Sequence, residues 1–245
     1  MVNNKIKIVV IGNSVPLEMI PCRASKREGV FGELLAKELL NAGYNVELIM
    51  RAEHGADITE GLRNLQGNVL QHFPDLVIIN YGIVDCTPRL FPKFFVDYVK
   101  MPSPWPVEEV IKFLLRKASS FAGYTMLRYV HAGTWVPLRV FRNALGMMIE
   151  SIKRETAAHV IVLNIPSVHL RKHKDIRGLE ANIMKYNDAI ASVTQQKYAT
   201  LVDAFSLVQK TGMAASMPFD FHYNVHGHRV IARDLVLKIG SLMRE

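Results

Sequence analysis

Short apolar runs recur along the chain, and stretches with helical spacing separate them. The runs are rich in β-branched residues and do not alternate strictly between apolar and polar positions. Such runs are typical of parallel strands that are buried on both faces. The predicted strands cover residues 5–11, 45–50, 75–80, 159–165 and 200–202.

Between these runs, apolar residues recur every three or four positions, which predicts amphipathic helices. The predicted helices lie near 34–41, 58–73, 137–152, 183–193 and 226–243. Strands that alternate with helices indicate parallel strands joined by crossover connections. We therefore expect an α/β fold: three layers, flavodoxin-like, with a roughly five-stranded parallel sheet.

One stretch, about 87–135, interrupts this alternation and is far longer than an ordinary connection. Its prolines, at 102–106, separate two candidate helices, and it is rich in aromatic residues. Three interpretations stay open: a helical hairpin packed on the domain, a lid or wall of a substrate pocket, and a face for a partner or a membrane surface.

The composition is that of a globular protein, and the length suits one domain over 1–245. Neither a secretion signal nor an apolar run of membrane-spanning length is visible, so we expect a cytoplasmic protein without a transmembrane segment. In that compartment Cys22 and Cys86 are expected to be reduced thiols.

The formal net charge of +8 raises the question of a nucleic-acid partner. The basic residues are spread along the chain, however, and the densest group, at 171–174, has no interleaved aromatic residues. No nucleic acid is therefore expected as a partner. A solvated surface is the favoured interpretation, and attraction to an anionic substrate or lipid head group stays open.

Ser14 follows the first predicted strand and Gly12, at the sheet edge where open parallel sheets bind ligands. A serine becomes a nucleophile when a base accepts its proton and nearby N–H groups stabilise the oxyanion. Asp220 and His222 lie together before the last predicted helix, and a carboxylate so close to a histidine can orient the imidazole as a base. Taken alone, Ser14 also fits a turn or a helix N-cap, and His222 also fits a surface or capping residue.

Four short blocks then follow in order: Gly12-Asn13-Ser14, the segment 54–62 around Gly55, the segment 81–85, and Asp220 with His222. Together they resemble the GDSL-type, or SGNH, hydrolase family over nearly the whole length. The resemblance implies Ser14 as nucleophile, His222 as base and Asp220 as its orienting acid. It also implies that the N–H groups of Ser14 and Gly55 form the oxyanion hole.

Two positions depart from the family pattern. Val84 stands where the family has an asparagine that donates to the oxyanion, so one donor is missing, and Asn80 or Asn13 are candidates to replace it. The loss of such a donor typically costs about 3 kcal/mol of transition-state stabilisation. The aspartate also lies two residues before the histidine here, where three is usual.

Other sites are weaker. His222, His226 and His228 have a spacing that suits a metal, but the latter two fit a helix start equally well, so no metal is expected. No phosphate-binding loop and no GxSxG motif occur. Asn80, Asp85 and Arg89 are possible substrate-binding residues, although a structural hydrogen bond is favoured for Asp85 and a surface ion pair for Arg89.

The sequence thus predicts a serine esterase that needs no cofactor and cleaves a small-molecule, carbohydrate or lipid acyl ester, possibly an acetyl ester, through an acyl-enzyme. Two alternatives stay open: an O-acyltransferase that uses the same residues on a sugar or lipid hydroxyl, and a non-catalytic binding module, suggested by Val84. The sequence does not predict an oligomeric state.

Overall fold

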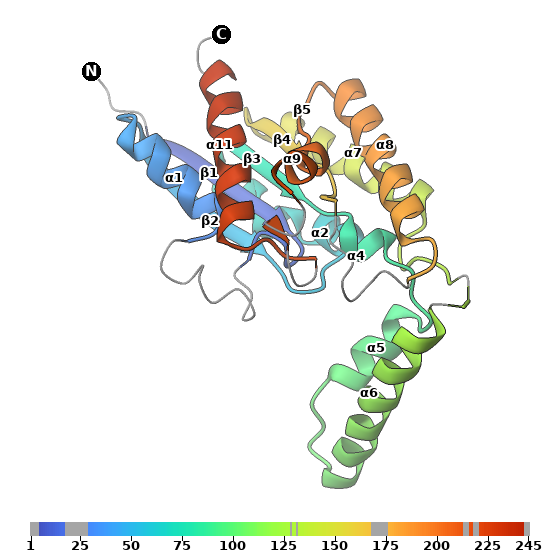
Figure 1. Ribbon diagram of the computed structural model, residues 1–245. Coiled ribbons are helices and arrows are strands. Elements are labelled where there is room, and N and C mark those ends of the chain that lie inside the picture. The colour runs from blue at the N-terminus through green and yellow to red at the C-terminus, as the bar shows by residue number, and fades with distance from the viewer. Residues whose placement is uncertain are drawn as a thin grey trace.

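The structure is a computed structural model that describes residues 5–17, 29–127, 129–130, 132–167, 176–212, 216–217 and 221–242, with 118–125 described by their backbone alone. At its centre lies a five-stranded parallel sheet with the order β2-β1-β3-β4-β5 (Figure 1). The strands are β1 (Lys5–Gly12), β2 (Asn45–Ala52), β3 (Leu76–Asn80), β4 (His159–Leu163) and β5 (Thr200–Val202). The predicted fold is confirmed, and the strands differ from the predicted ranges only at their ends.

Helices cover both faces of the sheet and complete the three layers (Figure 1). The helical elements are α1 (Phe31–Asn41), α2 (Ile58–Arg63), α3 (Leu65–Asn68), η2 (Leu70–His72), α4 (Ile83–Cys86), α5 (Lys93–Lys100), α6 (Pro106–Met126), α7 (Leu138–Glu155), α8 (Leu179–Gln196), α9 (Ala204–Thr211) and α11 (Val225–Leu242). α1 packs against α11, and α2 packs against α7, which also contacts α8.

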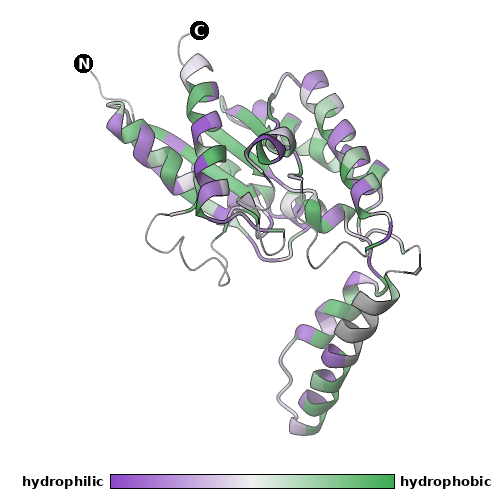
Figure 2. Cartoon of the chain, viewed as in Figure 1, coloured by the Kyte–Doolittle hydropathy of each residue, from purple (hydrophilic) through white to green (hydrophobic). Residues whose placement is uncertain are grey.

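The core lies between the sheet and these helices. All five residues of β3 are buried, as are the last four of β4, because both strands are covered on both faces. Burial of one such aliphatic side chain stabilises the fold by about 1.5–3 kcal/mol. Figure 2 shows these strands as hydrophobic. Among the described residues, no helix is both long enough and apolar enough to cross a membrane.

The predicted helix at 58–73 is wrong as a single element. The chain instead forms α2, α3 and the short helix η2. Phe73, which we placed on the apolar face, has a φ of 46° and is mostly exposed. The next residue is a proline, which disfavours helical backbone at the position before it, so the helix ends before β3.

Between β3 and α7, the chain forms the antiparallel pair α5 and α6, which we call the hairpin arm. These two helices contact each other and extend away from the sheet (Figure 1). A β-bridge between Pro88 and Thr134 closes the base of this segment, and the N–H of Arg89 donates to the carbonyl of Gly133 at 2.8 Å. The segment therefore leaves and rejoins the body at one place.

Candidate active site

Ser14 lies in a turn just beyond the carboxyl end of β1. This strand is flanked by β2 and β3, and the sheet order reverses here, which is where open α/β sheets bind ligands. The N–H of Asn13 donates to the carbonyl of Asn80 at 3.2 Å, and the Oδ1 of Asn13 accepts from the N–H of Val15 at 2.9 Å. The N–H of Leu17 donates to the carbonyl of Ser14 at 3.0 Å. These bonds fix the turn.

Gly12 permits the close approach of β1 and β3 at this turn. A Cβ atom at residue 12 would lie 2.4 Å from the backbone oxygen of Asn80, which is closer than real Cβ contacts. Since the obstructing atom belongs to the backbone, a larger residue would force the two strands apart. Gly12 therefore sets the position of Ser14 relative to β3.

His222 reaches Ser14 from the other end of the chain. Its Nε2 lies 2.8 Å from Ser14 Oγ, although 208 residues separate the two in sequence. This distance is a hydrogen bond in which the serine hydroxyl donates when Nε2 carries no proton. The neighbouring Tyr223 is fully buried and packs edge-on against His228, with ring centroids 5.4 Å apart, so the segment before α11 is anchored.

Asp220 lies outside the described residues, and so do Cys22 and the basic group at 171–174. The role of Asp220 as the acid that orients His222 stays a prediction.

Two backbone N–H groups are available for an oxyanion. Gly55 has a φ of 72°, a left-handed conformation that favours glycine. Within the described ranges, no acceptor pairs with the N–H of Ser14 or of Gly55. The N–H of Glu53 donates to the carbonyl of Gly12 at 3.0 Å, which ties the Gly55 segment to the end of β1. The oxyanion hole itself stays a prediction.

The segment after β3 is buried. Val84 lies in α4, and its side chain has no hydrogen-bond donor. The carboxylate of Asp85 accepts from the N–H groups of Ile58 and Gly82, each at 2.9 Å, and burial raises the pKa of Asp85 to about 7. Asp85 thus joins the start of α2 to the turn after β3. Asn80 is buried too, and its Oδ1 has no hydrogen-bond partner among the described residues.

A groove of about 1110 Å³ runs from this region along the base of the hairpin arm. It meets the site at Gly55 and at Phe221, the neighbour of His222, although Ser14 itself is not a lining residue. The guanidinium of Arg89 lies 4.6 Å from the ring centroid of Trp135, and both residues line the groove. The groove thus offers a binding surface beside the Ser14–His222 pair.

Three residues of this region are not found by the sequence reasoning: Trp135, Phe221 and Lys93. The ammonium of Lys93 pairs with Asp57 at 3.2 Å and with Glu60, which joins the start of α5 to the start of α2. The capping box formed by Asp57 and Glu60 is readable in sequence, but its distant partner is not. Trp135 and Phe221 lie outside regular elements, where no periodicity marks them.

His228 is buried, and its Nδ1 accepts from the N–H of Phe31 at 3.2 Å. Burial, together with the charge of His222, lowers the pKa of His228 to about 3. A neutral imidazole therefore fixes the start of α1 against α11. In the part of the chain that the structure describes, no group of three or more His, Cys, Asp or Glu residues is placed to hold a metal ion.

The model of the GDSL-like Lipase/Acylhydrolase family matches residues 11–230. The match thus extends from the end of β1 into α11 and includes Ser14, Gly55 and His222. A search of curated proteins finds no match.

Several solved structures are similar over almost their whole length. A lipase/acylhydrolase from Enterococcus faecalis has a TM-score of 0.65 at 17% identity, with 96% of this chain and 95% of that chain covered. An acetylxylan esterase from Geobacillus stearothermophilus has a TM-score of 0.64 at 16% identity, with 96% and 94% covered. An α/β hydrolase enzyme from the metagenome of Lake Arreo has a TM-score of 0.63 at 17% identity, with the same coverage. At such identities, these structures show the shared fold.

Proposed function

The chain belongs to the GDSL-like lipase/acylhydrolase family, and from this premise we propose that it hydrolyses carboxylic acyl esters with Ser14 as the nucleophile and His222 as the base. The observation that carries the proposal is the 2.8 Å hydrogen bond between Ser14 Oγ and His222 Nε2. A hydroxyl that is hydrogen-bonded to an imidazole nitrogen transfers its proton to that nitrogen as its oxygen attacks a carbonyl carbon.

In the first half of the reaction, Ser14 Oγ attacks the acyl carbonyl carbon while its proton moves to Nε2 of His222. The carbonyl oxygen becomes an oxyanion, and the N–H groups of Ser14 and Gly55 donate to it. The ester bond then breaks, His222 returns the proton to the departing alcohol oxygen, and the acyl group stays on Ser14. Asp220 holds the imidazole in the tautomer that this sequence requires.

In the second half, a water molecule attacks the acyl group on Ser14 and gives its proton to His222 Nε2. The same donors stabilise the second oxyanion, and the carboxylic acid leaves as the proton returns to Ser14 Oγ. With Val84 in place of a side-chain donor, two backbone N–H groups carry this stabilisation. We therefore expect slower turnover than a three-donor site would give.

For the substrate, we propose an acyl ester on a carbohydrate, with acetyl as the simplest acyl group. Phe91 and Trp135 give the groove aromatic surfaces beside Arg89, and such surfaces suit the flat apolar faces of sugar rings. One of the similar structures is an acetylxylan esterase.

The substitution Ser14→Ala tests the proposal. We expect kcat/KM for p-nitrophenyl acetate to fall by at least about 10³-fold, because the nucleophile is removed, while the midpoint of thermal unfolding stays the same. Ser241→Ala, an exposed serine of α11, is the matched control and should keep the wild-type rate. Undiminished turnover by the folded Ser14→Ala protein would contradict the assignment.

A further inference from the structure

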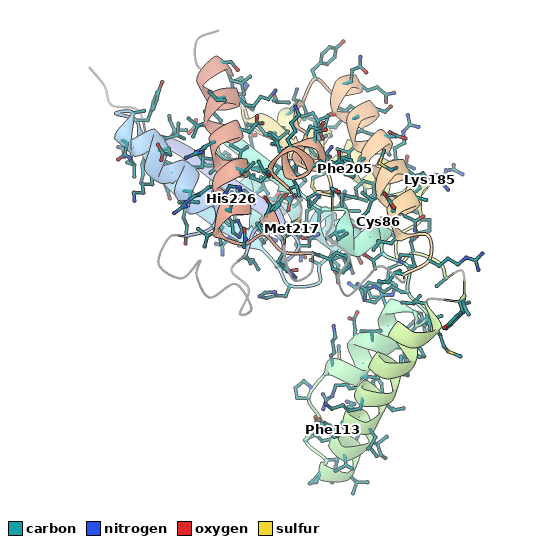
Figure 3. All side chains as sticks on the ribbon, viewed as in Figure 1. Cys86, Phe113, Lys185, Phe205, Met217 and His226 are labelled. Carbon is teal, nitrogen blue, oxygen red and sulfur yellow. The ribbon has the colours of Figure 1, made fainter. Side chains whose placement is uncertain are left out.

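The hairpin arm exposes an apolar stripe. On α6, Val107, Val110, Ile111 and Leu114 follow the spacing of one helix face, and each exposes more than half of its surface. Trp105, which directly precedes α6, is 70% exposed. We call these five residues the arm stripe. Figure 2 shows hydrophobic residues along α6, and in Figure 3 Phe113 of the same helix lies on the arm, away from Met217 and His226 of the body.

The polar residue Lys112 of α6 makes its contacts within the arm. Lys112 is 4% exposed: its ammonium pairs with Glu108 at 2.9 Å, donates to the carbonyl of Met101 at 3.2 Å and lies 4.5 Å from the ring centroid of Tyr98. The hydrogen bond to Met101 and the contact with Tyr98 thus hold α6 to the α5 side, whereas the ion pair lies within α6. A helix pair that is complete in water has the reverse arrangement, with apolar side chains between the helices and polar ones outside.

A second polar contact shows the same orientation. Arg116 pairs with Glu109 at 2.6 Å and donates to the carbonyl of Val99 in α5 at 3.4 Å. Lys112 and Arg116 thus point toward α5, whereas the arm stripe is exposed to solvent. An exposed apolar surface of this kind is typical of a site that binds a protein partner or a membrane.

We propose that the arm stripe docks on the surface of a membrane that contains anionic lipids. The charge complements such a surface: residues 93–126 carry five basic and three acidic residues, and the chain as a whole carries +8. Lys100 and Lys117 are exposed, and neither forms an ion pair within the described residues. Aliphatic side chains on one helix face, with a tryptophan and lysines beside them, suit the interfacial region of a bilayer.

The size of the stripe argues against a second copy of the chain as its occupant. A stable protein interface uses about 20–30 residues on each side, whereas the arm stripe has five. Insertion into a lipid interface needs no matching surface of that extent, because the acyl region surrounds each side chain.

The groove beside the Ser14–His222 pair also reaches the hairpin arm. It runs from Gly55 to Met101 and Pro102, which connect α5 to α6, so its far end reaches the arm, although no residue of the arm stripe lines it. Docking itself does not depend on the chemistry at Ser14.

Co-sedimentation with vesicles tests the proposal. The wild-type chain should bind vesicles of phosphatidylcholine with phosphatidylglycerol and bind phosphatidylcholine alone weakly. In Val110→Ser/Ile111→Ser/Leu114→Ser, the partition coefficient should fall at least about tenfold, because apolar side chains no longer enter the interface. Leu237→Ser is the control, since Leu237 is a leucine on α11 that is even more exposed than Leu114. Circular dichroism checks whether both variants are folded.

Tryptophan fluorescence gives a second readout, because the chain has only Trp105 and Trp135. Anionic vesicles should shift the emission of the wild type to the blue, and Trp105→Phe should abolish the shift. Equal binding by the wild type and the triple variant, or absence of wild-type binding, overturns the proposal. A dimer that the triple variant loses, without vesicle binding, identifies a second copy instead. Ser14→Ala should bind vesicles like the wild type. Vesicle binding therefore tests the docking proposal independently of the catalytic assignment.

Discussion

Two long helices of the same chain use their apolar residues in opposite ways. α7 turns Phe141, Leu145 and Met148 into the core, and each is at most 1% exposed. α6 has a comparable set in Val110, Ile111 and Leu114, and each of these is at least half exposed. Both helices are amphipathic, so the pattern that predicts a helix does not say what its apolar face contacts.

The two helices belong to parts of the molecule that differ in how far their apolar side chains are buried. The sheet and its covering helices bury one continuous apolar core, and this body holds the Ser14–His222 pair. In the hairpin arm, Lys112 is buried and its ammonium is paired, whereas the residues of the arm stripe are exposed. We therefore propose that the body carries the ester chemistry and that the arm attaches the chain to a membrane.

Two leucine substitutions, one in each helix, test this comparison, and we expect them to differ most in the free energy of unfolding. Leu145→Ala in α7 should lower the free energy of unfolding by about 2–5 kcal/mol, since it removes a buried side chain and leaves a cavity. Leu114→Ala in α6 should change it by no more than about 0.5 kcal/mol, because the side chain is exposed. Urea denaturation measures both. A comparable loss in the two variants would mean that the arm stripe is part of the core.

Acid should weaken the body through His228, with a smaller effect. The pKa of His228 is lowered from 6.5 to about 3, so on acidification the unfolded chain binds a proton well before the folded chain does. The free energy of unfolding therefore falls as the pH drops below 6.5. At about pH 5.5 this group alone lowers it by about 1 kcal/mol relative to neutral pH. Urea denaturation at the two pH values measures the difference.

His228→Asn isolates this contribution, because the asparagine oxygen can accept from the N–H of Phe31 and does not titrate. Asp85 acts in the opposite sense: its raised pKa makes the folded chain bind a proton first, so its contribution grows as the pH falls. Asp85 is present in both proteins and cancels in the comparison. If His228→Asn lost as much stability on acidification as the wild type, His228 would not be the titrating group.

Much of the fold is predictable from the sequence because buried parallel strands have a local signal. Runs such as 75–80 are apolar on both faces, and the strand order follows from the fold class that they indicate. The end of the second helix is not predictable from the apolar period alone. Phe73 continues that period, but Pro74 and the return to β3 end the helix earlier.

The candidate site is predictable only where a short motif marks it. Ser14 and His222 lie in such motifs, and the structure brings their side chains together. Arg89 and Trp135 are different, because their stacking depends on how the chain closes the base of the 87–135 segment. The orientation of α6 is not predictable either: whether Lys112 or Leu114 faces α5 is decided by tertiary contacts that the helical period does not contain.

Labelling of the wild-type chain with a fluorophosphonate, mapped by mass spectrometry, tests the central claim most directly. The reagent forms a covalent bond with serines whose hydroxyl is activated by a neighbouring base. We expect modification at Ser14 and a strong reduction of labelling in His222→Ala, in which Ser14 lacks its partner at 2.8 Å. An unlabelled Ser14 in the folded protein, or equal labelling with and without His222, would contradict the account.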